Sequence, residues 1–254
     1  MTDLLARLSD LDPRFAVLPA LPAAAGTDWL AADRLVDPVS PETVAALDAE
    51  EHASGHTTRH AAALSMLAAY ACTVPTAAIA GWALTGAVLD MRAANVAVQL
   101  GDHHGFEAYA VREVRVGDGG VAQLVDEVLL EHLLPLAESL HSCTRAGLRQ
   151  LHGGVGFGIA TAFSLLSRLD QDLDLLQRRY EELVASVAER TDVDLHDLGE
   201  LRRVTASPDG TGPARLFYLR RTCCLVYTSA QPGLCASCCL LSEADRVEVY
   251  RSMA

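Results

Sequence analysis

Five of the seven cysteines of this 254-residue chain lie in one short segment near its C-terminal end. Four of them follow the pattern C-C-x10-C-x2-C, from Cys223 and Cys224 to Cys235 and Cys238, and Cys239 comes directly after. Thiolates grouped in this way are typical ligands of zinc or of iron–sulfur clusters, because both bind sulfur tetrahedrally. The segment therefore predicts a metal centre, with thiol redox chemistry or a disulfide as a further alternative.

The adjacent pair Cys223 and Cys224 favours a cluster over a single zinc ion. Successive side chains of an extended chain point to opposite sides, so one metal ion would need a distorted backbone to take both thiolates. A 2Fe–2S cluster has two separated iron atoms and uses four cysteine ligands. Residues 231–233 read Gln-Pro-Gly, which predicts a turn that folds the second pair of cysteines back onto the first.

The tail resembles that of the FhuF-type ferric siderophore reductases, which carry two arginines just before an adjacent cysteine pair and a C-x2-C pair ten residues later. The resemblance implies four ligands for a 2Fe–2S cluster: Cys223, Cys224, Cys235 and Cys238. The family often has a residue other than cysteine after its last ligand, whereas this chain has Cys239, which is therefore the alternative fourth ligand or a spare thiol. A weaker resemblance covers residues 60–200, which are similar to the helical domain that the family shares with siderophore synthetases.

The resemblance implies one-electron reduction of a ferric siderophore, most simply one of the hydroxamate type. Fe(II) binds hard oxygen donors far more weakly than Fe(III), so the electron releases the iron. We expect no catalytic residue beyond the cluster, which an unidentified flavoprotein or ferredoxin would reduce. The alternative is a zinc-stabilised or iron–sulfur sensor or binding protein without reductase activity.

Arg220 and Arg221 are the candidates for side chains that surround the ligands. Residues 211–254 contain five Arg against three Asp and Glu, a balance of +2 in a chain whose formal charge is −13. A four-thiolate 2Fe–2S unit is an anion, so these cations would neutralise it and raise its potential. The alternative is an ordinary solvated pair of arginines.

The sequence predicts that the elements around this segment form an α+β protein, mostly helical with a small antiparallel sheet. We expect a helical body over 1–205, which starts with an extended arm with a short helix over 1–39, and a Cys-rich cluster-binding segment over 206–254, with a loop at 206–213 between them. Hydrophobic periodicity and capping signals predict the following elements: helices over 41–53, 58–72 and 76–90, a hairpin of strands 96–100 and 106–116, a helix from 124 to 140 that Pro135 kinks, a Gly-rich joint at 153–158, and a long helix over 165–187.

Several side chains outside the cysteine segment are further candidates for a functional role. His52, His56 and His60 are spaced four apart and are expected on one solvated helix face, with metal binding as the alternative. His103 and His104 lie in the predicted hairpin turn, where substrate contact is the alternative to a plain turn. The glycines of 153–158 lack the Lys-Ser/Thr of a P-loop and predict close helix packing. Two further thiols are expected in the core: Cys72 and Cys143.

Composition excludes some classes of protein. An apolar fraction of 50% is too high for a disordered chain. The charge of −13 argues against nucleic acid as a partner. Residues 1–14 carry charges that a secretory signal lacks, so we expect a cytoplasmic protein, with peripheral contact to the inner membrane as a further expectation. The uncharged stretch 61–89 is long enough to span a bilayer, but its composition and Pro75 favour two buried helices.

Overall fold

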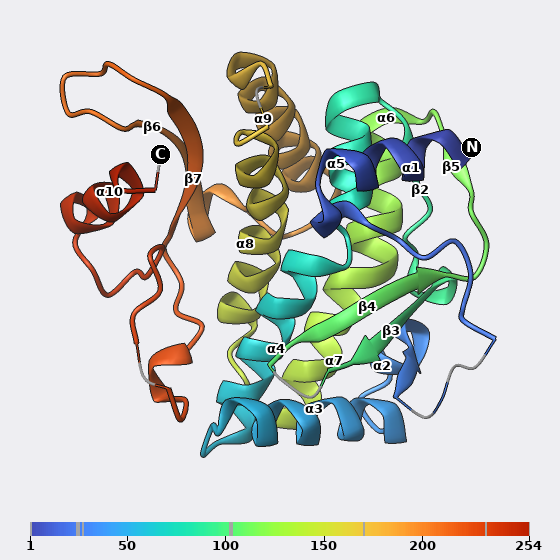
Figure 1. Cartoon of the computed structure of the whole chain (residues 1–254). Coiled ribbons are helices and arrows are strands. Elements are labelled where there is room, and N and C mark those ends of the chain that lie inside the picture. Colours follow the sequence, from blue (N-terminus) through green and yellow to red (C-terminus); the bar gives the residue numbers. More distant parts are fainter. Residues whose placement is uncertain are drawn as a thin grey trace.

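The computed structural model describes residues 2–23, 26, 28–101, 104–169, 171–231 and 233–253, with the side chains of residues 2 and 3 left aside. The fold is α+β, as predicted, with a large helical body and small antiparallel sheets. Figure 1 shows the body on one side of the central helix and a thin layer formed by the C-terminal segment on the other. The five clustered cysteines, from Cys223 to Cys239, lie in this layer.

The N-terminal residues contain more structure than the extended arm with a short helix that we expected over 1–39. They form α1 (Thr2–Leu11), η1 (Pro13–Phe15), β1 (Trp29–Ala31) and α2 (Ala32–Leu35). Leu8, Phe15 and Leu35 are buried in the main core. The Pro-rich composition hid this packing, because prolines break the periodicity between short elements without preventing their apolar residues from docking.

Three consecutive helices confirm the prediction for the next part of the chain: α3 (Pro41–Ser54), α4 (Arg59–Thr73) and α5 (Thr76–Thr85). Ser40 caps α3 by accepting from the Thr43 amide, and Gly55 ends it in the left-handed conformation. By length and composition, α4 and α5 together could cross a membrane, but 83% of the most apolar window is buried inside the protein. This burial agrees with two core helices. The third helix is shorter than expected, because Gly86 ends it with a positive φ.

The predicted hairpin is present as β3 (Val96–Leu100) and β4 (Phe106–Val111), and β1 completes an antiparallel sheet in the order β1-β3-β4. The second strand ends earlier than expected. After a break, β5 (Val116–Gly117) pairs with β2 (Val88–Leu89) instead, and η2 (Ala93–Asn95) leads into the hairpin. The Asn95 side chain supports this break by donating to the carbonyl oxygens of Asp90 and Glu113.

The helical segment after the sheet contains a widened, π-helical stretch just before Pro135. It runs as α6 (Gly120–Leu124), the π-helix η3 (Val125–Leu133) and α7 (Leu134–Thr144). Pro135 lies in the first turn of α7, where its missing N–H costs little. Two separate helices then replace the long helix expected over 165–187, α8 (Leu148–Leu166) and α9 (Leu173–Arg190), and Asp172 caps the second.

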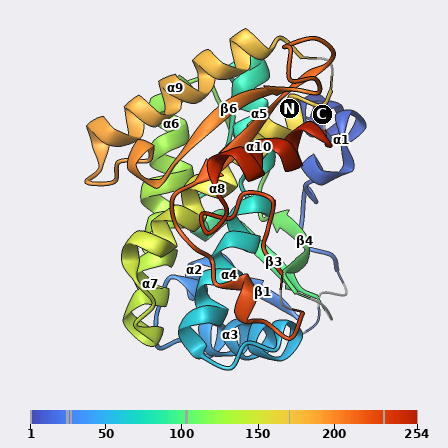
Figure 2. The ribbon, with the colours of Figure 1, turned by 90° about the vertical axis from the view of Figure 1, so that its left-hand side faces the viewer.

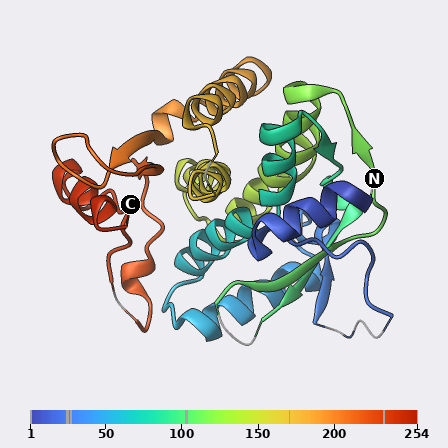
Figure 3. The same ribbon diagram turned by 45° about the horizontal axis from the view of Figure 1, so that its top comes forward.

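Helix α8 is the centre of the molecule, and Figure 3 shows it almost end-on between the C-terminal layer and the other helices. The glycines expected to form a joint lie inside this helix, but the predicted close packing is confirmed. A Cβ on Gly158 would overlap the backbone of Ala71 on α4, and one on Gly153 would overlap Thr222 in the C-terminal layer. The glycines thus let α8 touch both neighbours with its backbone.

The C-terminal layer begins with η4 (His196–Leu198) and the hairpin of β6 (Gly199–Thr205) and β7 (Ala214–Arg220). The loop 206–213, expected to divide the body from the tail, joins these two paired strands. After β7 come η5 (Val226–Thr228) and α10 (Glu243–Arg251). Tyr250 of α10 stacks on Phe217 at 4.3 Å, which fixes the helix on the hairpin, as Figure 2 shows from that side.

Candidate metal centre

The cysteine segment starts where β7 leaves the sheet. The Arg221 amide still donates to the Leu198 carbonyl at 2.9 Å, and Thr222 then lies against Gly153 of α8. Leu225 has a φ of +58°, a conformation that a leucine adopts only where its surroundings hold it. This turn carries the chain away from the sheet directly after Cys223 and Cys224.

The second cysteine pair returns to the first, as the sequence predicted from residues 231–233, of which Pro232 lies outside the described residues. Cys235 lies close enough to Cys224 to lower the pKa of its thiol, and Cys223 and Cys238 both raise the pKa of Cys239. The cysteines of the two pairs are therefore neighbours in space. A 2Fe–2S cluster needs such a group of four cysteine ligands, two for each iron atom.

Backbone and hydroxyl groups donate hydrogen bonds to the sulfurs. The Leu225 amide lies 3.4 Å from Cys223 Sγ, and the Ser237 hydroxyl lies 3.6 Å from Cys235 Sγ. The Cys238 amide donates to the Cys235 carbonyl at 2.9 Å, so a tight turn holds these two cysteines together. Such donors stabilise the anionic form of sulfur and tune the potential of a cluster that it binds.

Arg220 is a buried cation beside these thiols. Its residue is 2% exposed, and its Nε and Nη2 atoms have no hydrogen-bond partner among the described residues. The hydrogen bond from Cys235 lowers the pKa of Cys224 against the opposing effect of burial, and the charge of Arg220 adds to this lowering. A buried guanidinium without partners is costly, so the site is incomplete without an anion near Arg220.

Arg221 differs from Arg220 in exposure and contacts, although the sequence analysis predicted the same role for both. Its side chain is 53% exposed, and its Nη1 donates to the His196 carbonyl at 2.6 Å. Its other contact is an ion pair with Glu200 at 3.8 Å. Arg221 therefore holds the end of the hairpin in place, whereas Arg220 faces the thiols.

The residues present fit a 2Fe–2S cluster. The cysteines at 223, 224, 235 and 238 provide the ligands, and Arg220, whose Nε and Nη2 have no hydrogen-bond partner among the described residues, provides a buried positive charge. Thr222 Oγ1 is a second buried donor that lacks a partner within the part of the chain that the structure describes. Within the same part, no three Cys, His, Asp or Glu side chains converge as ligands of one metal ion.

The three histidines expected on one helix face are spread over different elements. His52 lies on α3 and His60 on α4, both exposed, whereas His56 lies in the turn after Gly55 and is 6% exposed. The prediction was wrong because Gly55 ends the helix and breaks the four-residue spacing. His56 Nδ1 lies 3.1 Å from Thr228 Oγ1 in the cysteine segment.

The hairpin turn places a second histidine near the cysteines. His103 lies outside the described residues, but His104 Nδ1 lies 2.8 Å from Oε1 of the buried Glu50. No sequence pattern predicts this pair, because Glu50 resembles the other charged residues of an exposed helix. The charge of Cys224 contributes to raising the pKa of His104, so the pair lies within electrostatic reach of the thiols.

The two remaining cysteines differ in their environment. Cys72 is half-buried against Thr161, and burial raises the pKa of its thiol to about 11. Cys143 was expected in the core but is exposed near the end of α7. Its position at the last turn of an amphipathic helix explains the error, because the apolar neighbours point to the other side.

Comparison with known families identifies the segment. The family model described as FhuF 2Fe-2S C-terminal domain matches residues 220–240. The match contains both arginines, the four predicted ligands and Cys239. The resemblance drawn from the cysteine spacing is thereby confirmed, and the cofactor of the site is a 2Fe–2S cluster. No curated protein matches the chain.

Proposed function

We propose that this chain, which carries an FhuF-type 2Fe–2S segment, is a ferric siderophore reductase that releases iron in the cytoplasm. The observation that carries the proposal is the family match over residues 220–240, in a segment whose cysteines lie beside a buried arginine. The site offers electron transfer rather than acid–base chemistry. The substrate is therefore expected to be a complex that changes its stability when it gains one electron.

The proposed reaction moves one electron. The cluster, when bound, supplies this electron, and the substrate Fe(III) becomes Fe(II). Hydroxamate oxygens hold Fe(II) weakly, so the ion leaves and the freed oxygens take up protons from the solvent. A one-electron donor, either a flavoprotein or a ferredoxin, then restores the reduced state of the protein.

The chain itself supplies charge compensation and access. Arg220 keeps a positive charge at the site in both redox states, because guanidinium does not lose its proton. Cys223, Cys235 and Cys239 are only partly buried, so the site lies near the surface. Around it, large apolar side chains are exposed at Tyr227 (41%) and Leu240 (58%). These features favour close approach of a substrate or of an electron donor.

A single-turnover experiment tests the proposal. The purified protein is photoreduced under anaerobic conditions and mixed with one equivalent of a ferric trihydroxamate in the presence of an Fe(II)-specific chelator. We expect loss of the EPR signal of the reduced cluster, bleaching of the ferric complex and about one Fe(II) per chain, since the cluster holds one transferable electron. The Cys235→Ser variant without cluster serves as the control.

A reduced cluster that keeps its EPR signal in the presence of several ferric siderophores would contradict the proposed function. That result would favour the iron–sulfur sensor instead. Electron transfer to ferric citrate at the same rate as to the siderophore would show a general ferric reductase and remove the siderophore from the proposal.

A further inference from the structure

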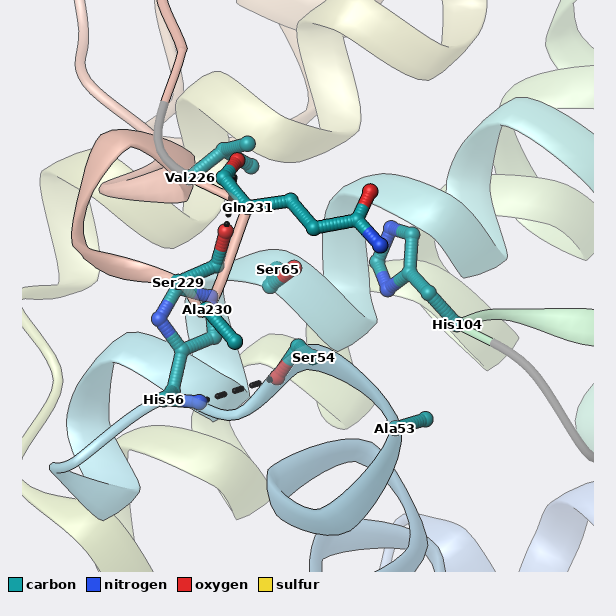
Figure 4. Close-up of a pocket in the computed structure, with 9 residues that line it drawn as sticks. All are labelled: Ala53, Ser54, His56, Ser65, His104, Val226, Ser229, Ala230 and Gln231. Carbon is teal, nitrogen blue, oxygen red and sulfur yellow. Dashed lines mark hydrogen bonds between the residues drawn. The ribbon is translucent and has the colours of Figure 1, made fainter.

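A cavity lies between the helical body and the cysteine segment, and we call it the histidine pocket. Its volume is about 350 Å³. Its lining comes from both parts of the molecule (Figure 4): Ala53, Ser54, His56, Ser65, His104, Val226, Ser229, Ala230 and Gln231. The segment that closes it is the one that connects Cys224 to Cys235. The volume is at the lower end of the range of ligand pockets.

The closing segment is fixed to the body by specific contacts. The Ala230 amide donates to the Ser54 carbonyl at 2.9 Å, and His56 Nδ1 lies 3.1 Å from Thr228 Oγ1. Gly55 lies so close to Ala230 that a Cβ on it would come within 2.5 Å of the alanine Cβ. The pocket is therefore a built feature of the fold, in which the turn after α3 and the cysteine segment are held against each other.

One side of the pocket is lined by an imidazole that is paired with a buried carboxylate. His104 Nδ1 lies 2.8 and 2.9 Å from the two carboxylate oxygens of Glu50, whose side chain is 3% exposed. The hydrogen bond to Glu50 raises the pKa of His104, which favours the imidazolium form. In Figure 4 the amide group of Gln231 lies beside the His104 ring. Together with the hydroxyl of Ser65, these groups offer hydrogen-bond donors to an oxygen-rich ligand.

The other side carries an unpartnered acceptor. The Thr228 hydroxyl donates to the Leu225 carbonyl at 2.8 Å, so its oxygen accepts from Nδ1–H of His56. In the neutral ring Nε2 then has a free lone pair, and this buried atom has no hydrogen-bond partner in the described ranges. Burial lowers the pKa of His56, which favours the neutral ring. A ligand with amide N–H groups beside its iron-binding oxygens matches both sides of the pocket.

The pocket also lies close to the thiols. Val226 in its wall is two residues from Cys224 in the sequence. The charge of Cys224 acts on the pKa of both His56 and His104, so both rings are within electrostatic reach of that thiol. An iron ion held between these rings would therefore be near the cluster ligands.

On these grounds, and resting on the reductase function proposed above, we propose that the histidine pocket binds the iron-hydroxamate centre of a ferric siderophore, with His104, Gln231 and Ser65 as donors to its oxygens. Because the pocket is small, the peripheral arms of the siderophore remain in solvent. A larger cavity of about 680 Å³ lies between η1, α4, α8 and β4. Its described lining includes no residue of the cysteine segment, so it provides the comparison for the test.

Binding is measured without electron transfer by using the gallium(III) complex of a linear trihydroxamate, which has the shape and charge of the ferric complex but is not reduced. The oxidised, cluster-loaded protein is titrated calorimetrically. We expect Ala53→Phe, which fills the pocket, and His104→Gln, which removes the cation but can still donate to Glu50, to raise Kd at least tenfold. Ala45→Phe, on the exposed face of the same helix, should leave Kd within twofold.

The inference is overturned if both pocket variants bind the gallium complex like the wild type, or if only Ala108→Phe in the larger cavity weakens binding. Iron content and circular dichroism of each variant exclude misfolding as the cause of a loss. Wild-type protein that binds the gallium complex but passes no electron to the ferric one contradicts the reductase function and leaves the pocket in place. If the wild-type protein reduces the ferric complex while both pocket variants bind the gallium complex normally, the pocket is not the binding site and the reductase function stands.

Discussion

The guanidinium of Arg220 lies over the ring of Phe157, with its carbon 4.6 Å from the ring centroid. Phe157 belongs to the glycine-containing part of α8, so the central helix of the body supports the cation that faces the cysteines. The Arg220 carbonyl in turn accepts from Arg246 of α10 at 2.8 Å. Body, hairpin and C-terminal helix thus meet at one residue beside the metal centre.

Replacing Arg220 with Gln should lower the midpoint potential of the cluster, because loss of a nearby positive charge destabilises the added electron. Two unit charges about 6 Å apart at an effective dielectric constant of 20 interact by about 3 kcal/mol, or roughly 120 mV for one electron. We expect a shift of that order in an EPR-monitored redox titration. The matched variant Arg221→Gln removes an exposed, solvent-screened charge and should shift the potential far less. Equal shifts in the two variants would contradict the separate roles assigned to these arginines.

The fourth ligand can be assigned by comparing Cys238→Ser with Cys239→Ser. Cys238 fits the family spacing and is 6% exposed, so we expect Cys239→Ser to retain about two iron and two sulfide per chain and Cys238→Ser to lose them. The measurement is iron and sulfide analysis together with the EPR signal on reduction. Both Cys223 and Cys238 raise the pKa of the Cys239 thiol, so Cys239 lies close enough to them for the competing outcome. Cluster loss in the Cys239 variant alone would make Cys239 the ligand.

Two glycines of α8 should respond oppositely to the same substitution. Gly158→Ala places a Cβ inside the backbone of Ala71, so overpacking should destabilise the protein by about 1–3 kcal/mol. At Gly154 the nearest atom to an added Cβ is 3.6 Å away, an ordinary contact. Gly154→Ala should therefore be neutral or stabilise by up to about 1 kcal/mol through helix propensity. Urea unfolding measures the free energy of unfolding of the two variants. Similar values would show that α4 and α8 can move apart without loss of stability.

Stability should fall in mild acid because of His132. Its Nδ1 donates to the Met91 carbonyl at 2.5 Å, and its Nε2 accepts from the Tyr70 hydroxyl at 2.6 Å, so the buried ring is satisfied only when neutral. Burial lowers the pKa of His132 from 6.5 to about 4. The unfolded chain therefore binds the proton first, and the stabilisation present above pH 6.5 is lost as the pH falls towards 4. Between pH 7.5 and pH 5 this loss amounts to about 2 kcal/mol.

Urea unfolding at several pH values tests this assignment. The variant His132→Gln cannot titrate, so its free energy of unfolding should vary less over the same range. His52→Gln, which changes an exposed histidine of α3, is the control and should keep the wild-type slope. An unchanged slope in the His132 variant would place the acid sensitivity elsewhere.

Local patterns predicted much of this molecule from the sequence. Cap residues, hydrophobic periodicity and a polar turn located α3, α4 and the β3–β4 hairpin, because each depends on residues close together in the chain. The cysteine spacing identified the cofactor segment for the same reason, since all five thiols lie within 17 residues. The adjacent pair favoured a cluster with two iron atoms over a single zinc ion, and the family match over residues 220–240 agrees.

Everything that depends on distant parts of the chain was decided by the tertiary structure. The sequence could not separate Arg220 from Arg221, because their difference arises in the tertiary structure. Arg220 is buried and packs against Phe157, whereas the side chain of Arg221 is half exposed to solvent. It could not join Glu50 to His104, which are 54 positions apart, or bring His56 to the cysteine segment 172 positions later. Such contacts form when whole elements dock, and no short pattern encodes them. The sequence therefore determined which cofactor the protein holds, and the tertiary structure decided which charges and which pocket surround it.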